Sequence, residues 1–382
     1  MARKIRMGMV GGGRGAFIGG VHRIAAAIDG EIDLVCGAFS STPEKSKASG
    51  EDLMLDPSRC YGDFKEMIQK EKRRKDRMDV VSIVTPNHMH FAPAKMALEN
   101  GFHVICDKPV TFSLSEARKL QEIVEKTGLT FALTHNYTGY PMVKEARQRI
   151  KNGAIGAIRK VVVEYPQGWL SFPVEKDGSK QAEWRTDPKR SGIAGAVGDI
   201  GTHAENLAEY ITGLKITELC ADVSRVVEGR VLDDDANVLL RFDNGARGIL
   251  HCSQICNGDW NGLNIRIYGE LGSLHWHQET PQYLHHKSTD GYQIYQPSVG
   301  QLSDSANAHS RIPFGHPEGY LEAFANVYRN FARTVRKRMN GEEPNEFDLD
   351  FPTIEDGIRG MQFVETVIAS GKSNSKWVKF KG

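Results

Sequence analysis

Short apolar runs alternate with amphipathic stretches over roughly the first third of the chain. Such runs, bounded by turn residues, predict buried strands, and the stretches between them have the apolar spacing of helices. The predicted strands are residues 5–10, 32–39, 80–84, 101–106 and 129–134, and the clearest helices are residues 21–28, 92–100 and 113–126. Alternation of this kind predicts an α/β fold with a doubly wound parallel sheet over residues 1–137.

The pattern changes at about residue 156, where strands follow one another and helices become rare. Strands are predicted at residues 158–165, 219–227, 236–242, 246–252 and 263–268, with an Asp-Asn-Gly hairpin turn at 243–245. The polar, histidine-rich residues 278–318 are predicted to be loop, and helices at 320–339 and 353–370 end the chain. Residues 138–382 are therefore predicted to form an α+β domain on a large open mixed or antiparallel sheet, which serves for substrate binding and oligomerisation.

Composition narrows the class of protein. The chain has 49 basic and 48 acidic residues and a net charge of +1, so charge gives no argument for nucleic acid or a membrane surface as partner. No apolar run approaches the roughly 20 residues of a membrane span, and the first residues lack the apolar stretch of a signal peptide. Scattered cysteines without metal-ligand spacing favour buried thiols in a cytoplasmic protein that binds no metal.

A glycine-rich turn follows the first predicted strand and precedes the first predicted helix. Residues 11–20 read GGGRGAFIGG, and Gly11-x-Gly13-x-x-Ala16 fits the dinucleotide fingerprint in its required strand–turn–helix context. Glycines let the backbone approach a pyrophosphate, whose charge is stabilised by free amides at the helix N-terminus. This predicts a Rossmann domain, with candidate cofactor contacts at Gly11, Gly13, Arg14, Ala16, Phe17 and Ile18.

The end of the second strand bears on the choice between NAD and NADP. An acidic residue there would bind the ribose 2′-hydroxyl of NAD, but the chain continues from Phe39 with Ser40, Ser41 and Thr42. These hydroxyls together with Lys45 could accept a 2′-phosphate. A helix cap at Thr42 followed by a solvated lysine explains the same residues equally well. The sequence therefore leaves NAD and NADP both open.

Three further strand ends carry polar residues that could reach a nucleotide. They are Thr85-Pro86-Asn87 with His90, Asp107-Lys108-Pro109, and Asn136. In open α/β sheets ligands bind at the carboxyl ends of the strands. Proline after Lys108 holds that residue in an extended backbone, which aims its ammonium group. Taken alone, a strand that ends in a charged turn explains Lys108 as well as a functional lysine does.

In the second half of the chain, Asp199 and His203 lie four residues apart at the start of a predicted helix, 198–212. At this spacing a carboxylate can orient an imidazole, or both can reach one ligand, and histidine suits proton transfer near neutral pH. For the pair alone, a helix cap and a buried structural histidine are the more common explanation. The lysine and the nucleotide turn reverse that balance. Candidate substrate-side residues are Tyr137, Trp169, Trp184, Arg185, Asp199 and His203, with basic neighbours Lys189 and Arg190.

The glycine turn, the Thr-Pro-Asn stretch with His90, Lys108-Pro109 and Asp199-x-Gly-x-His203 occur in an order that resembles the glucose–fructose oxidoreductase, inositol dehydrogenase and rhizopine-catabolism (Gfo/Idh/MocA) family. The resemblance covers essentially the whole chain and extends to a branch acting on glycosides. It implies a lysine near nicotinamide and substrate, an acid/base histidine and an aspartate that binds sugar or cyclitol hydroxyls, which fall on Lys108, His203 and Asp199. Two departures are the shorter carboxylate of Asp107, where glutamate is common, and a glycine turn about three residues longer.

This resemblance implies an enzyme that transfers hydride between nicotinamide and a secondary alcohol of a sugar, glycoside or cyclitol. The alternative within the family is an NAD-dependent glycosidase that oxidises C3 transiently, eliminates the aglycone and reduces the ring again. A third class, a nucleotide-sensing protein without catalysis, would lack the lysine or the histidine, and both are present.

The second domain also predicts assembly. Residues 238–240 and 248–250 are apolar in succession, so we expect apolar side chains on both faces of the open sheet. A second apolar face would be covered by another copy of the chain, as relatives commonly associate through this sheet. The expectation is a homodimer or homotetramer.

Overall fold

The computed structural model describes residues 3–380, which form two compact units. The first unit comprises the residues up to Asn136 together with Leu321–Ile358, and the second comprises Tyr137–Tyr320 and the residues from Arg359 on. The segment 321–358 thus packs with the first unit, although the sequence analysis placed it in the second domain. A helix far along the chain had no local sign of joining the earlier sheet. The assignment of separate roles to the two domains stays a prediction.

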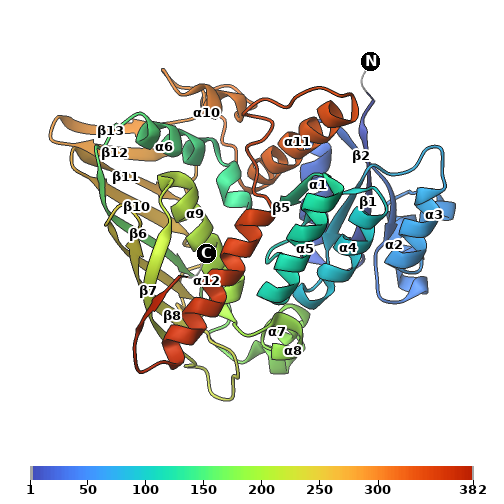
Figure 1. The fold of residues 1–382 in the computed structure, drawn as a ribbon, viewed down its shortest axis with the longest axis horizontal. Coiled ribbons are helices and arrows are strands. Elements are labelled where there is room, and N and C mark those ends of the chain that lie inside the picture. Colours follow the sequence, from blue (N-terminus) through green and yellow to red (C-terminus); the bar gives the residue numbers. More distant parts are fainter. Residues whose placement is uncertain (1–2, 381–382) are drawn as a thin grey trace. The chain divides into compact units, whose positions relative to one another are not determined.

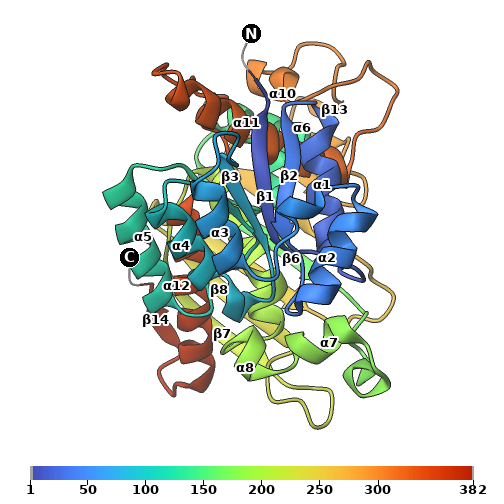
Figure 2. The ribbon, with the colours of Figure 1, turned by 90° about the vertical axis from the view of Figure 1, so that its right-hand side faces the viewer.

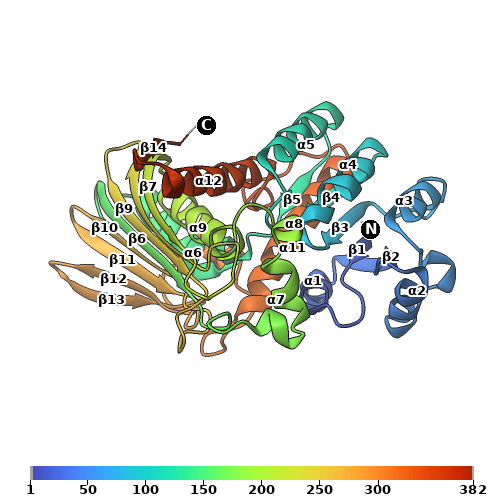
Figure 3. The same ribbon diagram turned by 90° about the horizontal axis from the view of Figure 1, so that it is seen from below.

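A five-stranded parallel sheet forms the centre of the first unit, with strand order β2-β1-β3-β4-β5. The strands are β1 (Ile5–Gly11), β2 (Ile32–Ala38), β3 (Val80–Val84), β4 (His103–Cys106) and β5 (Phe131–Leu133). The helices are α1 (Phe17–Ile28), α2 (Pro43–Asp52), α3 (Phe64–Lys72), α4 (Phe91–Glu99), α5 (Leu114–Thr127) and α11 (Tyr320–Met339), with 3₁₀ turns at Pro57–Arg59 and Asn87–Met89. Helices α3, α4 and α5 cover one face of the sheet, and α1 and α11 cover the other (Figure 3). The predicted doubly wound parallel sheet is confirmed.

The starts of α5 and α2 are capped differently. Ser113 caps α5 by accepting from the backbone N–H of Glu116, and the Glu116 carboxylate accepts from the backbone N–H of Phe112. Thr42 occupies the cap position of α2, yet its hydroxyl makes no capping hydrogen bond. The Thr42 Oγ1 atom is buried and has no hydrogen-bond partner.

A nine-stranded mixed sheet forms the second unit, in the order β13-β12-β11-β10-β6-β9-β8-β7-β14 (Figure 1). The strands are β6 (Ile158–Pro166), β7 (Ile216–Ser224), β8 (Asp235–Phe242), β9 (Arg247–Ser253), β10 (Asn264–Gly269), β11 (Gly272–His277), β12 (Leu284–Ser288), β13 (Gly291–Tyr295) and β14 (Trp377–Lys379). The helices are α6 (Pro141–Lys151), α7 (Lys180–Arg185), α8 (Pro188–Ser191), α9 (Thr202–Thr212), α10 (Asp304–Ala308) and α12 (Ile354–Lys372), with 3₁₀ turns at Asn136–Gly139 and Val174–Asp177 and a π-helical turn at Val197–Gly201. Only β6 and β9 pair in parallel; the other neighbours are antiparallel. The predicted hairpin turn joins β8 to β9, where Gly245 has φ +88°.

The prediction of a loop at 278–318 is wrong, because β12, β13 and α10 lie within it. Strand β13 is at the edge of the sheet, and almost all of its residues are exposed. In β12 only Leu284 is fully buried, while Lys287 faces solvent. Edge strands of this kind are held by backbone pairing and carry polar side chains, so they lack the apolar alternation on which the sequence argument depended.

The two faces of the nine-stranded sheet differ. Helices α6, α9 and α12 lie along one face, and no helix of the described residues covers the other (Figure 3). Val238, Leu240 and Leu250 are buried on the covered face, while Leu239 and Ile249 alternate onto the bare face. The bare face also carries ion pairs, such as Arg241 with Glu218 (2.7 Å). Apolar side chains therefore lie on both faces, as expected, but on the bare face they are mixed with charged pairs, since the period of two sends most apolar residues inward.

Candidate functional site

The polar residues predicted to bind a nucleotide all follow strands of the first unit. The glycine turn follows β1, Ser40 follows β2, Thr85 follows β3, Asp107 follows β4 and Asn136 follows β5. Strands β2, β1 and β3 lie side by side in Figure 2. Because the five strands are parallel, these residues stand at a single edge of the sheet, where open α/β sheets bind ligands.

The glycine turn brings the backbone of α1 against the end of β1. Gly11 and Gly12 have φ of +84° and +72°, which favours glycine. A Cβ atom on Gly19 would lie 2.3 Å from the Cα of Gly12, so the two backbones touch. Gly19 is thus the glycine of close helix–strand packing in this turn. Ala16 instead occupies the cap position before α1, and the turn is longer than the fingerprint requires.

The start of α1 fits a pyrophosphate. Its first turn carries no acidic residue, and its first amides have no partner in the helix itself. Phe17, the first residue of the helix, is 69% exposed. On the side toward α2, a cavity of about 380 Å³ is lined by the turn and by Ser49 and Asp52. Arg14 of the turn pairs there with Asp52, its Nη2 lying 2.6 Å from Oδ1.

The side chains after β2 leave the cofactor question open. Ser41 and Lys45 are exposed, and Ser40 is half-buried. The described strand end carries no carboxylate; the acid closest to the glycine turn is Asp52, contributed by the far end of α2 and already paired with Arg14.

Asp107 occupies a half-buried position at the end of β4. Its Oδ1 accepts hydrogen bonds from the backbone N–H of Lys108 (2.9 Å) and from Oγ1 of Thr134 (2.8 Å). Burial by itself would raise the pKa of Asp107, but the nearby imidazole of His22 and the charge of Lys108 hold that pKa below its usual range. An ionised carboxylate therefore holds the backbone of Lys108 in place.

His90 joins two of the strand ends. Its Nδ1 lies 2.7 Å from the carbonyl oxygen of Pro109, and its Nε2 lies 2.8 Å from that of Thr85. The ring is fully buried, and burial lowers the pKa of His90. Both ring nitrogens face backbone carbonyls, so His90 fixes the loops after β3 and β4 to each other. Its expected role as a cofactor contact stays a prediction.

In the second unit, Asp199 lies in a π-helical turn that leads directly into α9. Its Oδ2 accepts from Nε of Arg185 (3.1 Å) and from Nε2 of Gln254 (2.9 Å). A carboxylate paired with one guanidinium and one amide keeps its charge balanced and its orientation fixed. Arg185 also lies over the ring of Trp184, with 4.2 Å between the guanidinium carbon and the ring centroid.

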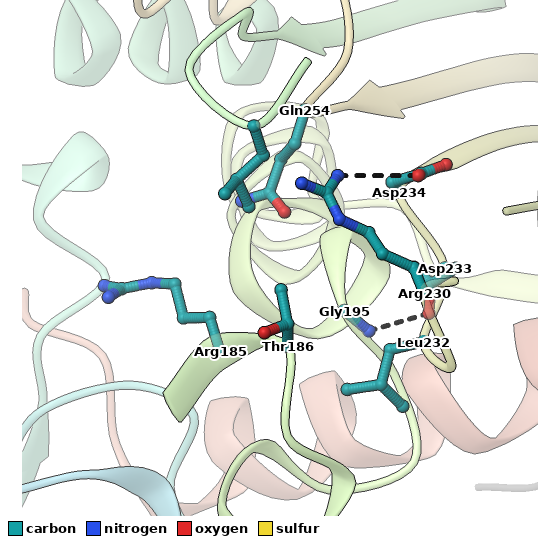
Figure 4. Close-up of a pocket in the computed structure, with 9 residues that line it drawn as sticks. Arg185, Thr186, Gly195, Arg230, Leu232, Asp233, Asp234 and Gln254 are labelled. Atoms are coloured by element: carbon teal, nitrogen blue, oxygen red, sulfur yellow. Dashed lines mark hydrogen bonds and ion pairs between the residues drawn. The ribbon is translucent and has the colours of Figure 1, made fainter. Parts of the chain in front are cut away.

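A second carboxylate holds the π-helical turn in place. Asp233 accepts from the backbone N–H of Gly195 (2.7 Å) and of Val197 (2.8 Å), one oxygen to each. Figure 4 shows the contact with Gly195 beside a small cavity, and shows Arg230 directed at the adjacent Asp234. Burial raises the pKa of Asp233, although its backbone hydrogen bonds oppose the change. The Asp233 carboxylate therefore fixes the segment that presents Asp199.

His203 lies in a cluster of buried aromatic rings. The ring of Tyr137 meets it edge-on at a centroid distance of 4.8 Å, and that of Tyr165 lies at 6.3 Å. The hydroxyl groups of the two tyrosines are hydrogen-bonded to each other. Burial raises the pKa of Tyr137 and of Tyr165, so both phenols stay protonated near neutral pH. The histidine is therefore the group of this cluster that can exchange a proton there.

A chain of amides extends the cluster. Tyr165 donates to Oδ1 of Asn261 (3.3 Å), which also accepts from Gln167 (2.8 Å). Trp169 in turn donates from Nε1 to Gln167 (3.0 Å). The second unit thus brings together six predicted residues: Tyr137, Trp169, Trp184, Arg185, Asp199 and His203. Arg190 instead pairs with Asp187 and Glu183 near the surface.

Sequence reasoning missed four members of this cluster: Tyr165, Gln167, Gln254 and Asn261. Tyr165 and Gln167 lie at the end of β6, and Gln254 follows β9. Strands β6 and β9 are the parallel pair of the sheet, so their carboxyl ends coincide. Polar residues just beyond two strands were a usable signal, but only with that pairing known.

Two properties of the described part of the chain bear on the class of site. Within residues 3–380, no three histidine, cysteine or acidic side chains are arranged to hold a metal ion. Over the same residues, no helix has the length and apolar character to cross a bilayer.

Comparisons with known proteins agree with both units. Residues 5–135 match the model of an oxidoreductase family with an NAD-binding Rossmann fold, and residues 143–275 match the GFO/IDH/MocA C-terminal domain. The uncharacterised oxidoreductase YfiI of Bacillus subtilis is 35% identical, over 100% of this chain and 98% of its own length. Levoglucosan dehydrogenase of Pseudarthrobacter phenanthrenivorans is 28% identical over 72% of this chain and 74% of its own.

A solved structure is similar over nearly the full length. It is an inositol dehydrogenase homologue from Azotobacter vinelandii complexed with NADH and myo-inositol, with a TM-score of 0.92 and 35% identity. The match covers 99% of this chain and 98% of that one.

Proposed function

Because the chain belongs to the GFO/IDH/MocA family of oxidoreductases, we propose that it is a dehydrogenase of an uncharged sugar, glycoside or cyclitol. The observation that carries the proposal is the setting of Asp199, whose carboxylate is fixed by Arg185 and Gln254 beside the ring cluster around His203. Charge and hydrogen-bonding groups are balanced there, so the cluster suits hydroxyl groups better than an ionised substrate.

Names of relatives support the same substrate class. The Azotobacter vinelandii homologue was solved with NADH and myo-inositol, and the Pseudarthrobacter relative is named for levoglucosan. In this chain, the Arg185 guanidinium already has a carboxylate partner in Asp199, so it gives no argument for an acidic substrate.

The proposed roles follow from the chemistry of each group. NAD, bound at the glycine turn and the strand ends of the first unit, supplies the hydride acceptor. His203 takes the hydroxyl proton of the carbinol, and Asp199 accepts a hydrogen bond that orients the substrate. Lys108 stabilises the negative charge that develops on the oxygen. The O–H of Tyr137 is used by Tyr165 and that of Tyr165 by Asn261, so these two rings line the site and help to exclude water.

The test is a panel of cyclitols, pyranosides and anhydro-sugars, assayed for NADH formation. We expect NADH to accumulate in proportion to substrate consumed. Cleavage of a glycoside without net NADH would instead indicate the glycosidase mechanism, which the dehydrogenase names of the relatives do not favour. Nucleotide binding with neither reaction across the panel would favour a sensor.

Cofactor choice is expected to be permissive. The residues after β2 offer Ser40, Ser41 and Lys45, and no carboxylate of the described strand end repels a 2′-phosphate. Titration calorimetry should therefore give dissociation constants for NAD and NADP within about tenfold, a free-energy difference of about 1.4 kcal/mol. A strong preference for NAD would contradict this, and Asp52→Asn would then show whether the carboxylate beside Arg14 is responsible.

We also propose that the bare face of the nine-stranded sheet is an interface between copies of the chain. Its exposed Leu239, Tyr268 and Ile294 lie among charged pairs, a mixture that suits an interface with polar contacts. Light scattering at micromolar concentration is expected to give a dimer or tetramer of the 42.5 kDa chain. A monomer alone would contradict the proposal. Leu239→Arg should dissociate the assembly, whereas the substitution Met54→Arg, at an exposed residue of the first unit, should not.

A further inference from the structure

A chain of buried polar side chains runs through the core of the first unit to Asp107. Ser82 of β3 lies 2.8 Å from the hydroxyl of Tyr328 on α11, and that hydroxyl lies 2.7 Å from Nδ1 of His22 on α1. On the other side of the ring, Nε2 of His22 lies 3.8 Å from Oδ1 of Asp107. Side chains from three elements thus converge on the carboxylate that precedes Lys108.

These groups occupy a place where apolar side chains would be the ordinary choice. Ser82, His22 and Tyr328 are each at most 1% exposed, between the sheet and the helices α1 and α11. Phe324 packs on the imidazole at a centroid distance of 5.0 Å. Burying polar groups costs free energy unless every one is satisfied, so an apolar core would have been simpler to build.

The contacts also select the proton position on the ring. The Tyr328 hydroxyl can donate to Nδ1 while it accepts from Ser82, which leaves the ring proton on Nε2, facing Asp107. His22 accordingly helps to hold the pKa of Asp107 below its usual range, against the effect of burial. Nε2 has no hydrogen-bond partner among the described residues, and Asp107, 3.8 Å away, is the acceptor that it faces.

We propose that His22 and Tyr328 are positioning residues that act on Lys108 through Asp107. The Asp107 carboxylate accepts from the backbone N–H of Lys108. The position of this carboxylate therefore fixes the backbone at Lys108, and with it the direction of the lysine side chain. The imidazole holds the carboxylate ionised and in place, and the tyrosine holds the imidazole in the required tautomer. This inference rests on the proposed role of Lys108 in the dehydrogenase.

Two substitutions of His22 separate the contacts of its two nitrogens. Glutamine places an amide near the position of Nε2, where it faces Asp107, while asparagine places one near Nδ1 and can reach only Tyr328. The positioning role predicts that kcat falls about 10- to 100-fold in His22→Asn and less in His22→Gln, with the KM for NAD unchanged in both. Tyr328→Phe, which removes a single oxygen, should lower kcat about tenfold.

If His22 and Tyr328 served only to stabilise the fold, the results would differ. The three variants would then lose thermal stability while those that fold keep their kcat, and His22→Asn and His22→Gln would rank by stability alone. Tyr61→Phe is the matched control, because it removes another buried hydroxyl of the first unit, which donates to Glu71 (2.8 Å). That control should lower the melting temperature without changing kcat. Equal kcat values for wild type, His22→Asn and Tyr328→Phe would overturn the proposal.

A second readout does not need turnover. The rate at which trinitrobenzenesulfonate modifies Lys108, followed by peptide mapping, reports the setting of the amine directly. The proposal predicts a changed rate at Lys108 in His22→Asn and Tyr328→Phe and an unchanged rate at Lys95, which pairs with Glu99 on the surface of α4. If the wild type turned over no polyol, the proposed function would fail, and this measurement would still decide the inference. An unchanged rate at Lys108 would overturn it.

Discussion

His203→Asn is expected to lower kcat about 10²- to 10⁴-fold and to remove the dependence of oxidation on pH near neutrality. The imidazole lies edge-on to Tyr137 in a buried cluster, and it is the group there that can take a proton, because burial raises the pKa of both neighbouring phenols. Asparagine keeps a polar side chain of similar reach but cannot act as a base. Rates of NADH formation across pH are the measurement.

The sign of the pH effect follows from the proposed role of the base. Oxidation in the wild type should rise with pH as the imidazole loses its proton, and in the variant this limb should be absent. His316→Ala, at an exposed histidine whose ring contacts only a backbone carbonyl, should keep the wild-type profile. A wild-type profile in His203→Asn would place the base elsewhere.

The second large effect is expected for Lys108→Ala, with kcat lowered about 10²- to 10³-fold and the affinity for NAD changed by less than an order of magnitude. The reason is that the ammonium group stabilises charge present only as the alkoxide forms, whereas cofactor binding draws on many backbone contacts at the glycine turn. Single-turnover kinetics and calorimetry measure the two quantities separately.

Lys95→Ala is the matched control for this change. Lys95 pairs with Glu99 on the surface of α4, so its loss removes a lysine of the same unit without touching a strand end. Near wild-type turnover in Lys108→Ala would remove that lysine from the mechanism. A collapse of NAD affinity would instead make Lys108 a binding residue.

Much of the fold was predictable because its signals are local. Strand β3 occupies residues 80–84 and helix α11 residues 320–339, as the apolar pattern predicted. The failures share a physical cause, which is dependence on distant partners. Strands β12 and β13 are stabilised by neighbours in the sheet rather than by their own apolar content, and α11 packs with a sheet that lies far earlier in the sequence.

In the candidate site, too, residues in local motifs could be predicted and residues brought in by distant strands could not. Asp199, His203 and Arg185 were found because each belongs to a short motif or a compact stretch. Gln254 reaches Asp199 only because β9 pairs in parallel with β6, a long-range fact that no local pattern contains. The glycine turn is a further example. Its fingerprint was visible in the sequence, but the contact between the backbones of Gly12 and Gly19 depends on how α1 packs on the end of β1.

That contact between Gly12 and Gly19 has a thermodynamic consequence. Helix α1 touches the glycine turn at Gly19 and, one turn further on, carries His22 toward the carboxylate of Asp107. Helix α1 is therefore a rigid connection between the glycine turn and Asp107. Thermodynamic linkage makes such coupling reciprocal. If a nucleotide bound at the glycine turn changes the affinity of Asp107 for a proton, protonation of Asp107 changes the affinity of the turn for that nucleotide by the same factor.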